Sequence, residues 1–168
     1  MNEKDFLEEG GIDPKKLFNE KEYSTIIVNR EGFSKKQNKV ADLVYELLEK
    51  ELSREETENI FKELKEGSAQ PVLVEAIQNV KRNDDKARLC AACWESGLDF
   101  TSYFSFFAEL SCAQDFLLAM EALTVVENIP GKITEEELKN VLVKAREAKN
   151  GNKDIIADLE ENIKSRMA

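Results

Sequence analysis

Four capping boxes lie along this chain, and they constrain its fold more than any other local feature. In a capping box, a Ser or Thr hydroxyl accepts a hydrogen bond from the backbone amide three residues later. The Glu or Gln side chain at that later position accepts a hydrogen bond from the backbone amide of the Ser or Thr. The four matches are Ser34-x-x-Gln37, Ser53-x-x-Glu56, Ser111-x-x-Gln114 and Thr134-x-x-Glu137. Each opens an apolar stripe of helical period, so we expect a helix to begin at each one.

Apolar residues recur at helical spacing through most of the chain. The first long stripe, from Val40 to Leu52, follows an i, i+3, i+4, i+7 pattern. The predicted helices span about 35–51, 54–66, 71–82, 85–96, 100–110 and 112–127, with two more around the stripes 138–148 and 155–163. Only seven Gly and three Pro interrupt 168 residues. This low share of chain breakers also favours long helices, and the predicted fold class is all-α.

The first 34 residues are less regular than the rest. We expect an irregular N-terminal segment over 1–34, followed by one helical domain over 35–168. Asp13-Pro14 fits a helix cap followed by a first helical residue. The segment 23–28 fits either a strand or a short helix, and because no partner strand is evident, we expect a helix.

A row of aromatic residues follows Asp99, which we expect to cap the helix over 100–110. The row consists of Phe100, Tyr103, Phe104 and Phe107. It fits either a platform for bases or sugars or part of the core, and its helical period favours the core. The next helix, over 112–127, is apolar nearly all round, so we expect it to be buried on several sides at the centre of the fold.

The predicted helices repeat in pairs. Leu64, Trp94 and Leu123 occupy equivalent places late in the second helix of successive pairs, at intervals of about 30 residues. Leu159 continues the series after a longer loop. The chain therefore divides into about four helix pairs.

The segment from Asp84 to Gly97 resembles the second half of a HEAT repeat. The matching positions are Asp84 or Asp85 in the turn, Ala87-Arg88, Ala91-Ala92, Trp94 and Gly97. The resemblance covers roughly 68–127, and it extends to 35–66 and 134–166 only through the helix pattern. It implies a right-handed α-α superhelix, a HEAT-like solenoid of about four antiparallel helix pairs. It also implies a structural ladder between repeats, for which Asp84, Asp85 and Arg88 are the candidates. The tetratricopeptide alternative has a period of about 34 residues and a signature that this chain lacks.

The residues that enzymes use most are sparse here. The chain has no His, no Gly-rich phosphate loop and no nucleophile motif, so we expect no enzyme activity and no cofactor. Cys90 and Cys93 form a CxxC on a helical pattern, and Cys112 stands apart. A redox pair or a zinc half-site is one interpretation, but no His supplies a fourth ligand. We expect three buried, unpaired and metal-free thiols.

The charge balance bears on partners and compartment. The formal net charge is −10, which disfavours a nucleic-acid partner because phosphate binding needs a Lys and Arg footprint. The acidic first residues lack the apolar run of a secretory signal. No window of about 18 uncharged apolar residues indicates a membrane span. We therefore expect a cytoplasmic protein with no membrane partner.

One stretch of the chain is acidic without any basic residue. Between residues 89 and 131 there is no Lys or Arg, and the acidic residues there are Glu95, Asp99, Glu109, Asp115, Glu121 and Glu127. We expect Glu95, Asp115 and Glu121 to contribute to an acidic binding strip for a basic protein. Two plainer interpretations compete with this one: the charge serves solubility alone, or Glu121 closes an internal salt bridge to Arg88.

Three functions fit these observations. The first is a non-enzymatic protein–protein interaction module that binds a basic partner through the surface of its second helices. The second is an acidic inhibitor or immunity-type protein that neutralises one basic enzyme. The third is a DNA-repair glycosylase of HEAT-like architecture, which the missing Lys and Arg over 89–131 disfavour.

Overall fold

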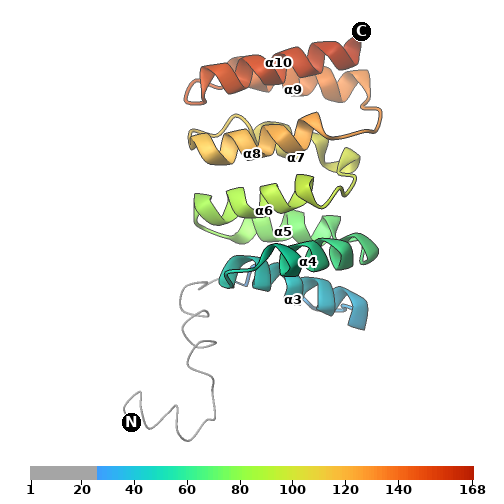
Figure 1. Cartoon of the computed structure of the whole chain (residues 1–168). Coiled ribbons are helices and arrows are strands. Elements are labelled where there is room, and N and C mark those ends of the chain that lie inside the picture. The colour runs from blue at the N-terminus through green and yellow to red at the C-terminus, as the bar shows by residue number, and fades with distance from the viewer. Residues whose placement is uncertain (1–25) are drawn as a thin grey trace, which may run out of the picture.

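The computed structural model describes residues 26–168, and this part of the chain is all-helical, with no strand. Its helices stack in a column from α3 to α10 (Figure 1). They are α3 (Lys35–Glu49), α4 (Arg54–Glu66), α5 (Gln70–Asn79), α6 (Asn83–Glu95), the 3-10 helix η1 (Thr101–Tyr103), α7 (Phe104–Leu110), α8 (Phe116–Glu127), α9 (Glu135–Glu147) and α10 (Lys153–Met167). The prediction of an all-α fold is confirmed.

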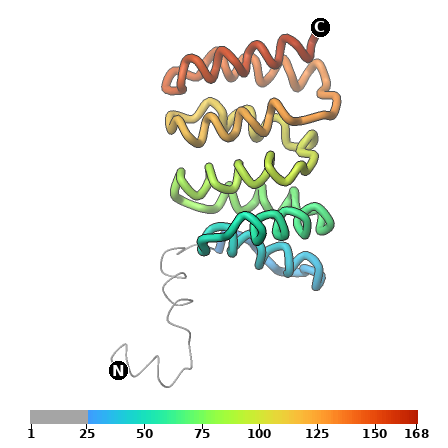
Figure 2. Tube along the Cα trace, viewed as in Figure 1, coloured from blue at the N-terminus to red at the C-terminus, as the bar shows by residue number. Residues whose placement is uncertain are grey.

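Consecutive helices pack as pairs, and the pairs follow one another along the column (Figure 2). We call α3, α5, α7 and α9 the first helices, and α4, α6, α8 and α10 the second helices. The second helices α6, α8 and α10 pack in series, and the first helices α7 and α9 pack on each other. The N-terminal end differs, because α3 packs against both α5 and α6.

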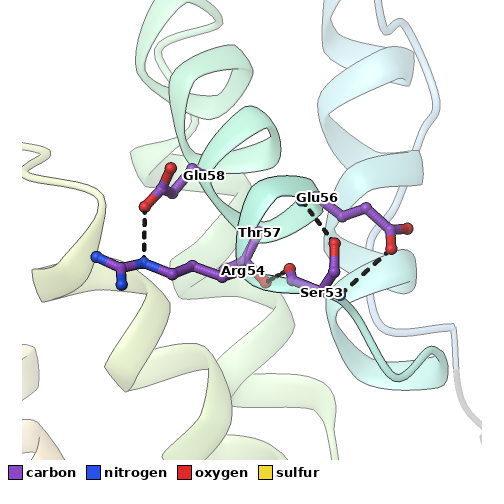
Figure 3. A network of polar contacts seen from close by, with 5 residues as sticks. All are labelled: Ser53, Arg54, Glu56, Thr57 and Glu58. Carbon is purple, nitrogen blue, oxygen red and sulfur yellow. Dashed lines mark hydrogen bonds and ion pairs between the residues drawn. The ribbon is translucent and has the colours of Figure 1, made fainter.

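Local side-chain chemistry sets the starts of several helices. The boxes at Ser34 and Ser53 have both of their hydrogen bonds, and Figure 3 shows the second with Glu56. An Arg54–Glu58 ion pair, 3.1 Å from Nε to Oε1, lies on the first turns of the same helix. The Thr134 hydroxyl accepts from the Glu137 amide at 3.2 Å. These three predicted starts are confirmed.

The predicted start at Ser111 is wrong. The Ser111 hydroxyl donates to the carbonyl of Ala108 at 2.6 Å, at the end of α7. The next helix begins later, because the Asp115 carboxylate accepts from the Leu118 amide at 2.9 Å and caps α8. The Ser111 hydroxyl is bonded to the preceding helix, so Asp115, which comes directly before the apolar run, caps the next one.

The aromatic row belongs to the core, as its period predicts, although it is not one helix. Asp99 accepts from the amide of Thr101 at 2.8 Å, but the cap residue of η1 is Phe100 and α7 begins only at Phe104, so the expectation that Asp99 caps the helix is wrong. Phe100, Phe104 and Phe107 are buried, and the rings of Phe100 and Phe107 meet edge to face with centroids 5.2 Å apart.

Helix α8 occupies the centre of the fold, where it packs against α6, α7 and α10. Leu123 is buried, as expected. The expectation that this helix is buried on several sides is confirmed, although Phe116, Leu117 and Met120 leave one apolar face exposed.

The described residues before α3 are not helical. Ile27 and Val28 are buried, and the Ile27 carbonyl accepts from the Asn79 amide group at 3.0 Å. The backbone amide of Asn29 donates to the Glu75 carboxylate at 2.7 Å. The expected helix is therefore wrong over 26–28, where contacts to α5 hold an irregular segment. The first residues of the expected helix, 23–25, and the predicted cap at 13–14 lie outside the described residues.

Over 26–168, no helix has the length and hydropathy needed to cross a membrane.

Candidate functional site

Two of the three predicted binding residues meet where α6 and α8 pack together. Glu121 on α8 accepts a hydrogen bond from the Trp94 indole Nε1 on α6, at 2.7 Å. Burial raises the pKa of Glu95, and the charge of Glu121 raises it further, which places the two carboxylates in the same region. Glu95 is exposed, and no ion pair joins it to another described residue.

The third predicted binding residue has a structural role. The Asp115 carboxylate caps α8, as described above, and is therefore already engaged at the start of that helix. Two other acids of the same stretch are also engaged within the fold. Glu109 pairs with Lys144 on α9, and Asp99 binds the backbone of Thr101.

The alternative in which Glu121 bridges to Arg88 is wrong. The Arg88 guanidinium donates from Nη1 to the carbonyl of Leu48 at 3.1 Å, near the end of α3. It reaches back to the preceding helix pair through a backbone acceptor, which sequence patterns do not reveal. Glu121 binds Trp94 instead, because the indole N–H of a half-buried Trp needs an acceptor.

The structural ladder is not formed in the expected way. Asp84 is exposed and lies 3.7 Å from Arg82, measured from Oδ2 to Nη2. Asp85 is buried, with 4% of its surface exposed. Arg88 does join neighbouring helix pairs, but its acceptor is the carbonyl of Leu48 and not a carboxylate.

A second feature of α8 escaped the sequence reasoning. Phe116 is 59% exposed, Leu117 45% and Met120 38%. We call these three side chains the α8 apolar patch. Their i, i+1, i+4 spacing puts them on one face, and the contact between Glu121 and Trp94 joins that face to the exposed face of α6. The sequence held one signal for this patch. Residues 116–126 contain more apolar residues than one buried helix face requires, so some of them could be expected at the surface.

A groove separates α4 from α6. It encloses about 530 Å³, and its apolar lining consists of Leu47, Leu48, Leu52, Phe61, Ala91 and Ala92. Charged residues at its margin are Glu49, Lys50, Glu51, Arg88 and Glu95. The groove exists because α3, and not α4, packs against α6. That arrangement depends on contacts far apart in the sequence, so local patterns do not reveal it.

The two basic side chains at the groove already have partners within the fold. Lys50 Nζ lies 3.0 Å from Glu46 Oε1, and the Arg88 guanidinium donates to the carbonyl of Leu48. Glu51 and Glu95, in contrast, form no ion pair with another described residue. The groove is therefore apolar at its base and acidic at its margin.

The three cysteines are free thiols that differ in burial. Cys90 and Cys93 are buried, and burial raises the pKa of Cys90 to about 12 and that of Cys93 as well. Cys112 is only half-buried, so the expectation of full burial is wrong for this thiol. Burial also raises its pKa. Raised pKa values keep the thiols protonated and slow to react. Within the described residues, no group of three His, Cys, Asp or Glu could hold a metal ion.

Comparison with protein-family models finds no match for this chain. Comparisons with curated proteins and with solved structures likewise find none.

Proposed function

We propose that this chain is a non-enzymatic protein-interaction module that binds a basic protein through the exposed faces of α6 and α8. The carrying observation is the α8 apolar patch beside Glu95 and Glu121, which no ion pair joins to another described residue. Three large apolar side chains clustered on one exposed helix face are typical of interaction sites, whereas the other exposed large apolar residues, Ile26, Val143 and Met167, lie elsewhere in the described structure. Phe116, Leu117 and Met120 supply the apolar contact, and Glu95 and Glu121 select for positive charge.

The arrangement of the helices agrees with this proposal. We infer a right-handed HEAT-like solenoid from the repeat of about 30 residues and from the serial packing of α6, α8 and α10. In such repeat proteins, each unit adds one helix to a continuous surface. Consecutive second helices then present their outer residues side by side, which suits a partner that spans more than one helix pair.

The acidic character of the surface follows from which acids remain available. Glu109, Asp99 and Asp115 are engaged within the fold. No ion pair joins Glu95 to another described residue, and Glu121 has an indole N–H as its described partner. A partner with Lys or Arg would complete these interactions and would associate faster at low salt.

Affinity capture from native extract tests the proposal. The bait is the full chain, compared with a double variant, Leu117→Glu with Met120→Glu, and with the control Val143→Glu. Val143 is also an exposed apolar residue, at 52%, but it lies on α9. We expect a basic protein to co-purify with the wild type and with Val143→Glu, and to be lost with the double variant. The same proteins recovered with all three baits would contradict the proposed surface.

A further inference from the structure

The groove between α4 and α6 interrupts an otherwise continuous layer of second helices. Helices α6, α8 and α10 pack directly in series, whereas α4 packs on α3 and faces α6 across the groove. The apolar residues that line the groove are Leu47, Leu48, Leu52, Phe61, Ala91 and Ala92. A partner's side chains can bury apolar surface there without displacing any helix.

The groove residues on α6 define the shape that fits. Arg88, Ala91, Ala92 and Glu95 line it at i, i+3, i+4 and i+7, over two helical turns or about 10 Å. The small alanines let another backbone approach closely. An occupying helix that presents apolar residues at the same spacing matches this length. An added strand does not fit, since the described structure has no sheet edge to pair with.

The charges at the margin define the chemistry that fits. Lys50 and Arg88 are engaged by Glu46 and by the carbonyl of Leu48. Glu51 and Glu95 have no ion pair in the described structure, so the margin offers two carboxylates to an incoming cation. An acidic occupant would bring like charges together, which opposes binding.

We propose that the α4–α6 groove binds an amphipathic helix of the basic partner, with the helix's apolar face against Phe61 and Ala91 and its Lys or Arg residues beside Glu51 and Glu95. This inference rests on the proposed function, because it names the part of that partner that binds and where it docks. The α8 apolar patch lies beyond α6 and provides a second contact region for the same partner.

Three synthetic peptides of about 18 residues test the groove against the full chain. The first has Leu at i, i+3, i+4 and i+7 with Lys elsewhere, the second replaces Lys by Glu, and the third replaces Leu by Ala. Binding is measured by fluorescence polarisation, and the bound surface is mapped by amide chemical shifts. We expect the Leu/Lys peptide to bind at least about ten-fold more tightly than either control, with shifts centred on Leu52, Phe61 and Ala91.

Two variants and their controls locate the binding. Ala91→Phe fills the groove and should weaken the Leu/Lys peptide at least about ten-fold, while Ala157→Phe, on the exposed side of α10, should not. Glu51→Gln with Glu95→Gln should weaken it as well, and Glu147→Gln with Glu161→Gln should not. Circular dichroism shows whether Ala91→Phe folds. If it does not fold, the two charge variants still test the groove.

The outcomes separate the groove from the proposed function. Absence of binding, equal binding of the Ala/Lys peptide, or equal affinity for Ala91→Phe in its folded form would overturn the groove proposal. So would shifts confined to Phe116, Leu117 and Met120, although the proposed function would then stand. The proposed function fails separately if the captured basic protein ignores the Leu117→Glu and Met120→Glu changes.

Discussion

Arg166 on α10 ties the C-terminal helix pair to the end of α8, and its removal should cost a large share of the stability. Its guanidinium donates from Nη2 to the carbonyls of Val126 and Ile129, at 2.9 and 3.0 Å, and from Nη1 to that of Gly131 at 3.5 Å. It also lies 5.3 Å from the ring centroid of Phe104. The Val126 carbonyl lies in the last turn of α8 and also accepts from the Ile129 amide at 3.2 Å, whereas Ile129 and Gly131 lie in the segment that follows the helix.

The expected cost of Arg166→Ala follows from these contacts. Hydrogen bonds of a charged group contribute about 1.5–3 kcal/mol. The contact with the ring of Phe104 adds about 0.5–1 kcal/mol at a partly exposed site. Because the hydrogen bonds share one side chain and are not additive, we expect about 2–4 kcal/mol in all. Arg146→Ala is the matched control, since Arg146 is exposed and lies 3.7 Å from Glu160, and it should cost less than about 1 kcal/mol.

Urea unfolding of the full chain measures both changes. Circular dichroism reports the helices, and the emission of Trp94, the single Trp of the chain, reports the contact of α6 with α8. Coincident transitions with an unchanged slope justify comparing midpoints. If Arg166→Ala shifts the midpoint no more than Arg146→Ala, the assigned hydrogen bonds do not hold α10 to α8, and the reasoning is refuted.

Three further predictions concern the core, a cap and the thiols. Leu123→Ala should cost about 2–5 kcal/mol in urea unfolding, because Leu123 is buried in α8; an unchanged midpoint would mean that α8 is not central. Asp115→Ala should cost about 1 kcal/mol and Asp115→Asn much less, since Asn also caps helices; equal costs in unfolding would show that capping is not its role. A thiol reagent without denaturant should label Cys112 first, and Cys90 and Cys93 only on unfolding, because burial leaves them protonated and inaccessible. Rapid labelling of Cys90 would contradict the packing of α6.

Helix starts were predictable where the deciding chemistry is local. The boxes at Ser34 and Ser53 involve residues three apart, so their pattern is visible in the sequence. The same pattern failed at Ser111, because the chain turns there and Asp115 caps the next helix. The signal for Asp115 was present, since an Asp directly precedes the apolar run that begins at Phe116.

The candidate site was predictable only in part. The repeat spacing and the acidic stretch brought Glu95 and Glu121 into consideration, and the structure places both at the junction of α6 and α8. The partner of Arg88 was not predictable, because it is a backbone carbonyl 40 residues away. The groove was not predictable either, because it depends on how α3 packs against α6.

The central claim is that carboxylates on the exposed faces of α6 and α8 bind a basic protein. The most direct test is the affinity of the full chain for the captured partner over a range of salt. It compares wild type with a double variant, Glu95→Gln with Glu121→Gln, which removes charge but keeps an acceptor for Trp94. The account predicts that wild-type affinity falls as salt rises, and that the stably folded variant binds at least about ten-fold more weakly at low salt with less salt dependence. Equal affinity of the two proteins across the salt range would contradict it.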